Sequence, residues 1–127
     1  MDANPIRAAA AGLAVNRIAL GLVYLVKPRS EAGRWVGEGA SRKASTVLTR
    51  GLASRDVALG AGALWALRSE DADPRPWFAA QALADTSDFA STLAVKGELP
   101  SSGVKLGAAL AGASAVVAAA AALLLEN

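Results

Sequence analysis

The chain of 127 residues contains no cysteine and no histidine. It therefore has no thiol for a disulfide or a thiolate nucleophile, no imidazole base, and neither the common zinc ligands nor the usual haem ligand. Aromatic residues make up only 5%, and the basic residues form no stripe interleaved with them, so nucleic acid is not an expected partner. Acid–base chemistry would have to come from Asp, Glu, Lys or the single tyrosine, Tyr24, and we expect no metal and no cofactor.

Apolar residues, by contrast, are abundant. They make up 54% of the chain, and the mean hydropathy is +0.35. A typical soluble protein has roughly 45 to 50% even when glycine is counted as apolar. The length is that of one domain. We therefore predict a single integral membrane domain covering residues 1–127.

Four apolar segments each approach the roughly 20 residues that cross a hydrocarbon core of about 30 Å. They cover residues 6–26, 44–67, 76–95 and 104–125, and are separated by a Lys-Pro pair and by the polar stretches "RSEDADPRP" and "KGELPSSG". This pattern predicts an all-α fold, a four-helix transmembrane bundle with antiparallel up-down topology. The alternative is a soluble, alanine-rich four-helix bundle, but the stretch "GAALAGASAVVAAAAALLL" has no polar face to turn toward water.

The distribution of basic residues predicts the orientation, because loops rich in Lys and Arg stay in the cytoplasm. The first and third connections hold Lys27, Arg29, Arg34, Arg42, Lys43, Lys96 and Lys105, whereas the other side holds Arg7, Arg68 and Arg75. We therefore predict a multi-pass protein of the cell membrane, with loop 27–43 in the cytoplasm and both termini outside. A short interfacial helix and a flexible loop are both consistent with the sequence of that loop.

Small residues recur at four-residue spacing in two segments. One series is Ser54, Ala58, Gly62 and Ala66; the other is Gly103, Gly107, Ala111, Ala115 and Ala119. In lipid, helices associate through such residues because they allow the backbones to approach closely. The two stripes predict either packing within one bundle or a homodimer interface.

Six formal charges lie inside the apolar segments, three positive and three negative: Arg17, Arg50, Arg55, Asp56, Asp85 and Asp88. A charge at the bilayer centre costs about 2.5 to 3.5 kcal/mol on insertion scales, so these groups should face one another. A rise of 1.5 Å per residue places all of them except Arg50 about 12 to 18 Å from the inner ends of their segments. We therefore predict a shared charge cluster near the midplane, in which Arg17 and Arg55 are the partners of Asp85 and Asp88.

Helical phase adds two amides to this cluster. Gln81, Asp85, Asp88 and Thr92 share one helix face, and Asn16 is adjacent to Arg17. Asn16, Arg17, Arg55 and Gln81 are candidate ligand-binding residues, and Asp56, Asp85 and Asp88 are candidate catalytic acids and bases, because a carboxyl that is not fully neutralised can carry a proton at neutral pH. Arg50, closer to the inner face, is predicted to contact a lipid headgroup. The alternative is a static cluster that fixes helix register.

The stretches "RIALGLVYLVKPR", "RGLASRDVALGAGAL" and "ALADTSDF", followed by an alanine-rich last segment, resemble small four-span membrane proteins of high-GC actinobacteria, some of them described as DoxX-like. The positions that match are Arg17, Arg55, Asp56, Asp85 and Asp88. DoxX-like proteins are associated with membrane redox complexes, so the resemblance implies an accessory subunit near quinones. The sequence itself shows no quinone or haem ligand pattern.

Three functions remain open at this point. The first is a membrane protein whose Arg and Asp residues bind a polar headgroup, a lipophilic ligand or a partner subunit. The second is a metal-free intramembrane enzyme that uses Asp acid–base chemistry on a lipophilic substrate, such as epoxide opening or isoprenoid cyclisation. The third, a proton-coupled carrier, is disfavoured because four helices without a broken span leave little room for alternating access. Expected partners are membrane lipids, a lipophilic small molecule and a second copy of the chain.

Overall fold

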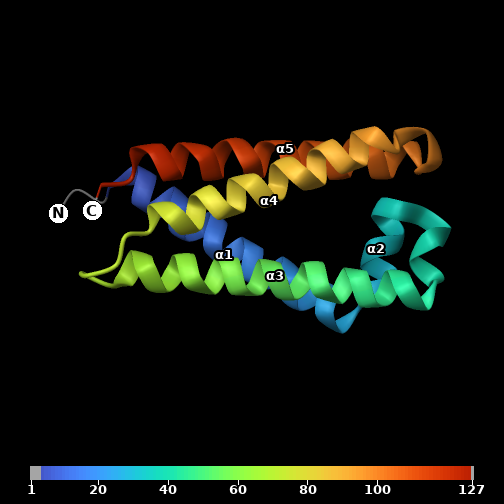
Figure 1. Cartoon of the computed structure of the whole chain (residues 1–127), viewed down its shortest axis with the longest axis horizontal. Helices are drawn as coiled ribbons and strands as arrows, with labels where there is room; N and C mark the ends of the chain where they lie inside the picture. The colour runs from blue at the N-terminus through green and yellow to red at the C-terminus, as the bar shows by residue number, and fades with distance from the viewer. Residues whose placement is uncertain (1–3, 127) are drawn as a thin grey trace.

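The computed structural model describes residues 4–126, and within this range the chain is all-α, as predicted. Four long helices run up and down: α1 (Pro5–Val26), α3 (Lys43–Arg68), α4 (Arg75–Ala94) and α5 (Ser101–Leu124). The connections contain α2 (Pro28–Val36) and two short 3₁₀ turns, Gly37–Ser41 and Lys96–Glu98. Figure 1 shows α2 at one end of the bundle and the α3–α4 loop at the other. The four apolar segments correspond to the four long helices.

Local chemistry sets the bounds of the first two helices. The side chain of Asn4 accepts hydrogen bonds from the first backbone N–H groups of α1, which have no partner inside the helix. Pro28 cannot continue α1 and begins α2 instead. Gly37 ends α2 with a φ of +69°, a conformation that favours glycine. Connection 27–43 is therefore a short helix with a defined turn rather than a flexible loop.

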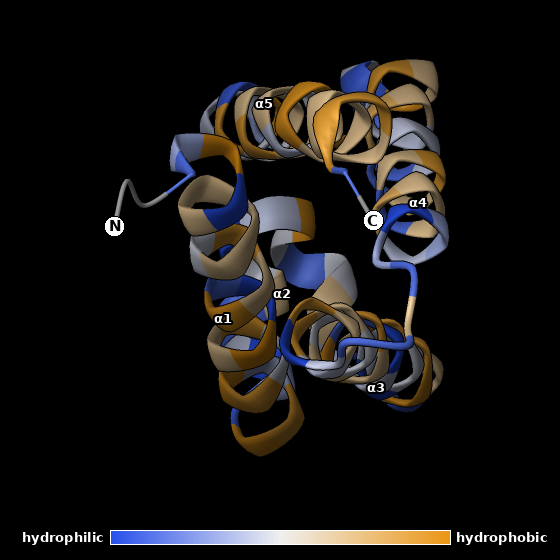
Figure 2. Cartoon of the chain, turned by 90° about the vertical axis from the view of Figure 1, so that its left-hand side faces the viewer, coloured by the Kyte–Doolittle hydropathy of each residue, from blue (hydrophilic) through white to orange (hydrophobic). Residues whose placement is uncertain are grey.

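The long helices pack as two antiparallel pairs, α1 with α3 and α4 with α5, and form the four sides of the bundle (Figure 2). The α1–α3 seam depends on two glycines. A Cβ on Gly21 would lie 2.8 Å from the carbonyl oxygen of Ala53, and one on Gly60 would lie 2.7 Å from that of Ala14. The two backbones therefore approach more closely than any larger residue would allow, as in other helix pairs built on small residues.

The two predicted small-residue stripes have different surroundings. On α5, Gly103 lies against the backbone of Trp35 and Gly107 against its indole ring, so this end of the stripe seats α2 within the same chain. On α3, Ser54 and Ala58 are exposed, because the face that meets α1 is the neighbouring one. A homodimer interface on the exposed part of the α3 stripe stays a prediction.

The buried hydrophobic residues are mostly small, and a cluster of them lies toward the end of the bundle where α1 begins and α5 ends. This core contains Ala10, Ala14, Ala63, Leu67, Phe78, Ala121 and Leu125. Large apolar side chains point outward instead, such as Leu83 on α4 and Leu123 on α5, which is 82% exposed. A soluble bundle has the opposite distribution, with its large apolar side chains inside.

Two helices, α1 and α5, are long and apolar enough to cross a membrane. Only 22% of the most apolar window of α1 and 11% of that of α5 are buried, so neither is the enclosed core helix of a soluble protein. Among the described residues α3 and α4, which carry most of the charged side chains inside the bundle, do not reach the same apolarity. The structure thus shows two possible spans, whereas the sequence pattern predicts four.

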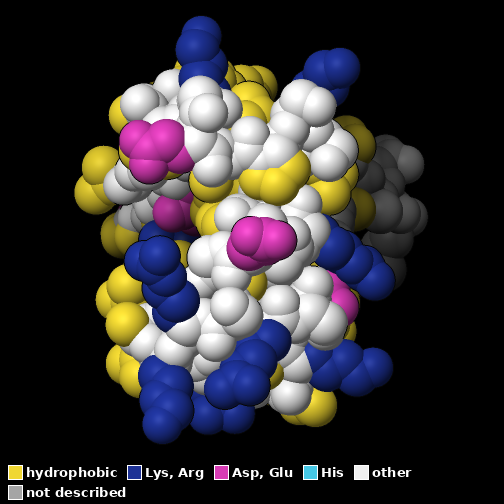
Figure 3. Space-filling view, turned by 90° about the vertical axis from the view of Figure 1, so that its right-hand side faces the viewer, with side chains coloured by type: hydrophobic (Ala, Val, Ile, Leu, Met, Phe, Trp, Pro, Cys, Tyr) yellow, Lys and Arg dark blue, Asp and Glu magenta, His cyan; other side chains and the backbone are white. Residues whose placement is uncertain are grey.

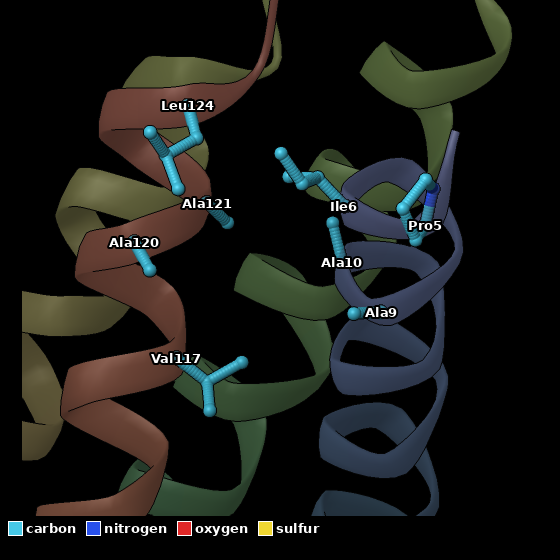
Figure 4. A pocket seen from close by; sticks show the side chains of 8 residues that line it. All are labelled: Pro5, Ile6, Ala9, Ala10, Val117, Ala120, Ala121 and Leu124. Carbon is cyan, nitrogen blue, oxygen red and sulfur yellow. The ribbon is translucent and has the colours of Figure 1, made fainter.

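A shallow groove of about 250 Å³ lies between the start of α1 and the end of α5 (Figure 4). Ile6 and Ala10 line it from α1, and Val117 and Leu124 line it from α5. Every side chain on its wall is apolar. The groove therefore has no side chain for catalysis or for recognising a polar ligand.

Candidate functional site

Arg17 on α1 contacts all three of the other long helices. Its guanidinium donates to Oδ1 of Asp56 on α3 at 3.0 Å, to Oδ2 of Asp85 on α4, and to Oγ of Ser114 on α5 at 3.2 Å. Its Nε donates to Oε1 of Gln81 at 3.2 Å. The planar, forked guanidinium suits such a junction because its donors point in fixed directions. Arg17 therefore joins α1, α3, α4 and α5 at one level.

Arg55 on α3 forms the second junction. It donates to Oδ1 of Asp56 at 3.1 and 3.2 Å, and its two terminal nitrogens bind the two carboxylate oxygens of Asp88 at 2.8 and 3.4 Å. Asp56 thus accepts from both arginines. The result is an alternating chain, Asp85, Arg17, Asp56, Arg55 and Asp88, which we call the Arg/Asp cluster. The structure brings together the five residues that the depth estimate grouped, with the expected partners.

The two ends of the Arg/Asp cluster differ in burial. The side chains of Arg17 and Asp85 are only 5% and 7% exposed, whereas those of Arg55, Asp56 and Asp88 are 30%, 27% and 21% exposed. Within residues 4–126 every buried side-chain polar atom has a hydrogen-bond partner. One end is therefore almost fully buried, and the other presents more of its charged atoms to open space.

That open space is a cavity of about 510 Å³ between the Arg/Asp cluster and α2. Its side walls include Leu20 of α1, Leu52 of α3, and Leu106 and Leu110 of α5. The cluster lines one part of the wall, and residues of α2 line another. The volume lies in the range of sites for small organic molecules, about 300 to 1,000 Å³, and apolar walls with a few converging polar groups are typical of them.

A hydrogen bond from Trp35 holds helix α2 against α4. Nε1 of Trp35 donates to Oγ1 of Thr92 at 3.2 Å, and that hydroxyl donates to the backbone carbonyl of Asp88 at 2.8 Å. Glu31 and Arg34 also line the cavity from α2 and form an ion pair at 3.4 Å. The helix therefore closes the end of the bundle over the cavity and is connected to the turn of α4 that carries Asp88.

The two candidate amides have unequal surroundings. Gln81 is fully buried, and its amide nitrogen donates to the carbonyl of Leu59 at 3.2 Å while its oxygen accepts from Arg17. Its position is therefore determined by the protein, which suits a residue that orients Arg17. Asn16 is exposed and lines the cavity, so it remains a candidate for direct contact with a ligand.

Arg50 lies outside the site. It is exposed on α3 and does not line the cavity. Five residues along a helix rotate the side-chain direction by about 140°, so Arg50 points away from the face that carries Arg55. The headgroup contact stays a prediction, but the balance of three positive and three negative charges does not apply to the site. The Arg/Asp cluster has two guanidinium groups and three carboxylates.

Three residues of the site were missed by the sequence pattern: Ser114, Trp35 and Glu31. Ser114 has a signal in the sequence, because it is the one polar side chain between Leu106 and Leu125. Trp35 and Glu31 lie in a connection whose path over the bundle has no signature in the sequence. Their contribution depends on where α2 folds back.

No family model, curated protein or solved structure matches the chain. The resemblance to DoxX-like proteins, and the accessory role near quinones that it implies, stay predictions from short motifs. The cavity and the Arg/Asp cluster are the features that bear on function.

Proposed function

We propose that the chain is a four-span membrane protein whose cavity binds a lipophilic molecule through a polar group recognised by the Arg/Asp cluster. The outward faces of all four long helices support the membrane location. Val26 on α1, Leu48 on α3, Leu83 on α4 and Leu123 on α5 are largely exposed. Such side chains are unfavourable in water but suit contact with lipid tails.

The distribution of charge supports the orientation. Figure 3 shows the end of the molecule at α2, where Lys and Arg side chains are spread over the face. By the positive-inside rule this end lies in the cytoplasm, and the termini and the α3–α4 loop lie outside. Helix α2 then rests at the inner membrane surface, and the cavity beneath it lies in the inner half of the bilayer.

The observation that carries the proposal is the contact between the exposed end of the Arg/Asp cluster and an apolar cavity. A cluster that only fixed helix register would be buried throughout, as it nearly is at Arg17 and Asp85. Arg55, Asp56 and Asp88 instead leave part of their charged surface at the cavity wall. Charged groups inside a membrane protein are costly to insert and characteristically mark a ligand or ion pathway.

Photolabelling tests this proposal. The purified protein in phosphatidylcholine nanodiscs is irradiated with a photoreactive 12-carbon alcohol, and the labelled peptides are identified by mass spectrometry. We expect labelling of α1 and α5 residues that line the cavity, and its loss when Leu110→Trp fills the cavity. Leu83→Trp, a matched change on the outward face of α4, should leave it unchanged. Labelling of outward faces alone would contradict the proposal.

One observation favours an enzyme as the second candidate. Arg55 lies between two carboxylates at the cavity wall, Asp56 and Asp88, and such a pair would act as base and acid without a metal. In epoxide opening, one carboxylate takes a proton from water as its oxygen bonds to carbon, and the other carboxyl protonates the oxygen released from that carbon. Asp85 is less suited because it is almost fully buried against Arg17.

Epoxide turnover separates the two candidates. The protein is incubated with 1,2-epoxydodecane, and the diol is measured with the wild type, Asp56→Asn and Asp88→Asn. If the protein is an enzyme, the rate of diol formation should fall by about 10²- to 10⁴-fold in either variant. A wild-type rate no higher than that of empty nanodiscs would reject epoxide opening and leave the binding function in place.

A further inference from the structure

We infer that the cavity selects a lipophilic cation, and specifically an ammonium group attached to an apolar chain. The inference rests on the proposed function, because it names the ligand class of the same site. The charged residues that line the cavity are Arg17, Arg34, Arg55, Glu31, Asp56, Asp85 and Asp88. These are three cations and four carboxylates, so the wall carries one negative charge in excess when all are ionised.

The excess charge lies at the Arg/Asp cluster. Glu31 and Arg34 on α2 neutralise each other at the far wall. In the cluster, three carboxylates share two guanidinium groups. Asp85 accepts from Arg17 and Asp88 from Arg55, and Asp56 accepts from both arginines. Asp85 is almost fully buried, whereas Asp56 and Asp88 are 27% and 21% exposed, so a ligand reaches the excess negative charge at the exposed end, between Asp56 and Asp88.

An anionic headgroup fits this wall poorly. The guanidinium groups of Arg17 and Arg55 already donate to carboxylates, so an anion would have to displace one of them. It would also raise the excess from one negative charge to two in a region of low dielectric. A neutral hydroxyl would leave the excess unchanged. A single ammonium group beside Asp56 and Asp88 brings the sum to zero and donates hydrogen bonds to both.

The apolar part of the ligand has a path from the bilayer. Helices α1 and α5 are close at the end that holds both termini and diverge toward α2 (Figure 1). Leu20, Leu106 and Leu110 line the cavity from the two diverging helices and are each about half exposed. A lipid-soluble chain can therefore enter sideways between α1 and α5 while its head reaches the cluster.

Three photoreactive probes with the same 12-carbon chain test the inference in neutral phosphatidylcholine nanodiscs. They carry a primary ammonium, a hydroxyl or a sulfate group. Labelling of cavity peptides is divided by labelling of the outward face of α4, which corrects for partition into the bilayer. We expect the ammonium probe to exceed the hydroxyl probe by at least about tenfold, and the sulfate probe to label least.

Variants of Asp88 test whether this residue causes the preference for the ammonium probe. Asp88→Asn should bring labelling by the ammonium probe down to the level of the hydroxyl probe, without changing labelling by the hydroxyl probe itself. Asp88→Glu, which keeps the charge, should retain most of the preference. Glu98→Gln removes an exposed carboxylate at the same end of the molecule and should have no effect.

The outcomes separate this inference from the function on which it rests. If the hydroxyl or sulfate probe labels the wild-type cavity as strongly as the ammonium probe, selection of a cation is wrong and the binding cavity stands. If no probe labels the cavity above the outward face, the proposed function fails and this inference fails with it. If Asp88→Asn does not fold, an unchanged preference in Asp88→Glu supports the inference, and equal labelling by all probes in that variant overturns it.

Discussion

At the scale of single residues, the two arginines of the Arg/Asp cluster differ in burial and in the helices that they contact. Arg17 is buried and has a partner on each of the other long helices. Arg55 is partly exposed, and its partners lie only on α3 and α4. Arg17 therefore mainly joins the helices of the bundle, whereas Arg55 exposes more of its side chain at the cavity wall, although their sequence contexts are similar.

Arg17→Ala should lower the free energy of unfolding by about 3 to 5 kcal/mol, because it leaves buried Asp85 without its cation. Arg17→Lys should restore only part of the loss, since one ammonium cannot reproduce the fork that reaches three helices. Denaturant unfolding in detergent, followed by circular dichroism, measures both. Arg50→Ala is the exposed control, and an Arg17→Ala variant as stable as that control would contradict the assignment.

Asp73, in the loop before α4, makes the stability of the chain depend on pH. Its carboxylate accepts hydrogen bonds from the side chain and the backbone N–H of Arg75, and these hold the pKa of Asp73 below its ordinary value. A pKa that is lower in the folded state stabilises the fold above the unfolded value of about 3.9. That contribution is lost as the pH falls through the folded-state pKa.

Asp73→Asn should therefore remove a component of the pH dependence of stability. Between pH 5 and pH 2 we expect the melting temperature of the wild type to fall more steeply than that of the variant. The two are compared by thermal unfolding in the same detergent. Parallel curves would show that the ion pair of Asp73 and Arg75 does not stabilise the start of α4.

At the scale of helices, the α1–α3 seam is formed by backbone contact. Gly60→Ala should destabilise the protein by about 1 to 3 kcal/mol, because the new Cβ would meet the carbonyl oxygen of Ala14. Gly51→Ala on the same helix has open space around it and should be neutral or stabilising by up to about 1 kcal/mol, through helix propensity. Denaturant unfolding distinguishes the pair, and equal stabilities would show that the seam can relax.

The sequence was sufficient to predict the long helices and the Arg/Asp cluster, for a physical reason. Pro28 and the charged stretches between segments end helices through local chemistry, and charges inside apolar helices have few favourable positions other than facing one another. The faces used for packing were less predictable. Small residues occur all around α3, so the four-residue spacing pointed to the helix face that carries Ser54 and Ala58. The face that packs against α1 instead carries Ala53 and Gly60.

At the scale of the whole molecule, α2 closes the cavity, and no periodic pattern in the sequence predicts this position. It returns over the bundle, seats Trp35 on Gly107, and covers a cavity that the four long helices alone would leave open at that end. The cavity, and with it the proposed ligand site, therefore depends on a connection as much as on the helices. Together, these elements place the cavity at the more basic end of the molecule.

Cysteine accessibility tests the proposed orientation, and the chain suits it because it contains no cysteine of its own. Ser41→Cys, in the turn after α2, should react with a membrane-impermeant maleimide only after cells are permeabilised. Glu70→Cys, in the α3–α4 loop, should react in intact cells. Reversed labelling would invert the orientation, and equal labelling of both in intact cells would contradict the four-span topology.

The division of the Arg/Asp cluster between the two helix pairs has a consequence for biosynthesis. The first half of the chain, α1 to α3, supplies both arginines and Asp56, so it leaves the ribosome with its own internal ion pair. The second half supplies Asp85 and Asp88 and depends on those arginines to neutralise them. In the proposed four-span topology, Asp56 of a nascent chain would therefore have its cations before the second half is made, whereas Asp85 and Asp88 would be without theirs until the two halves meet.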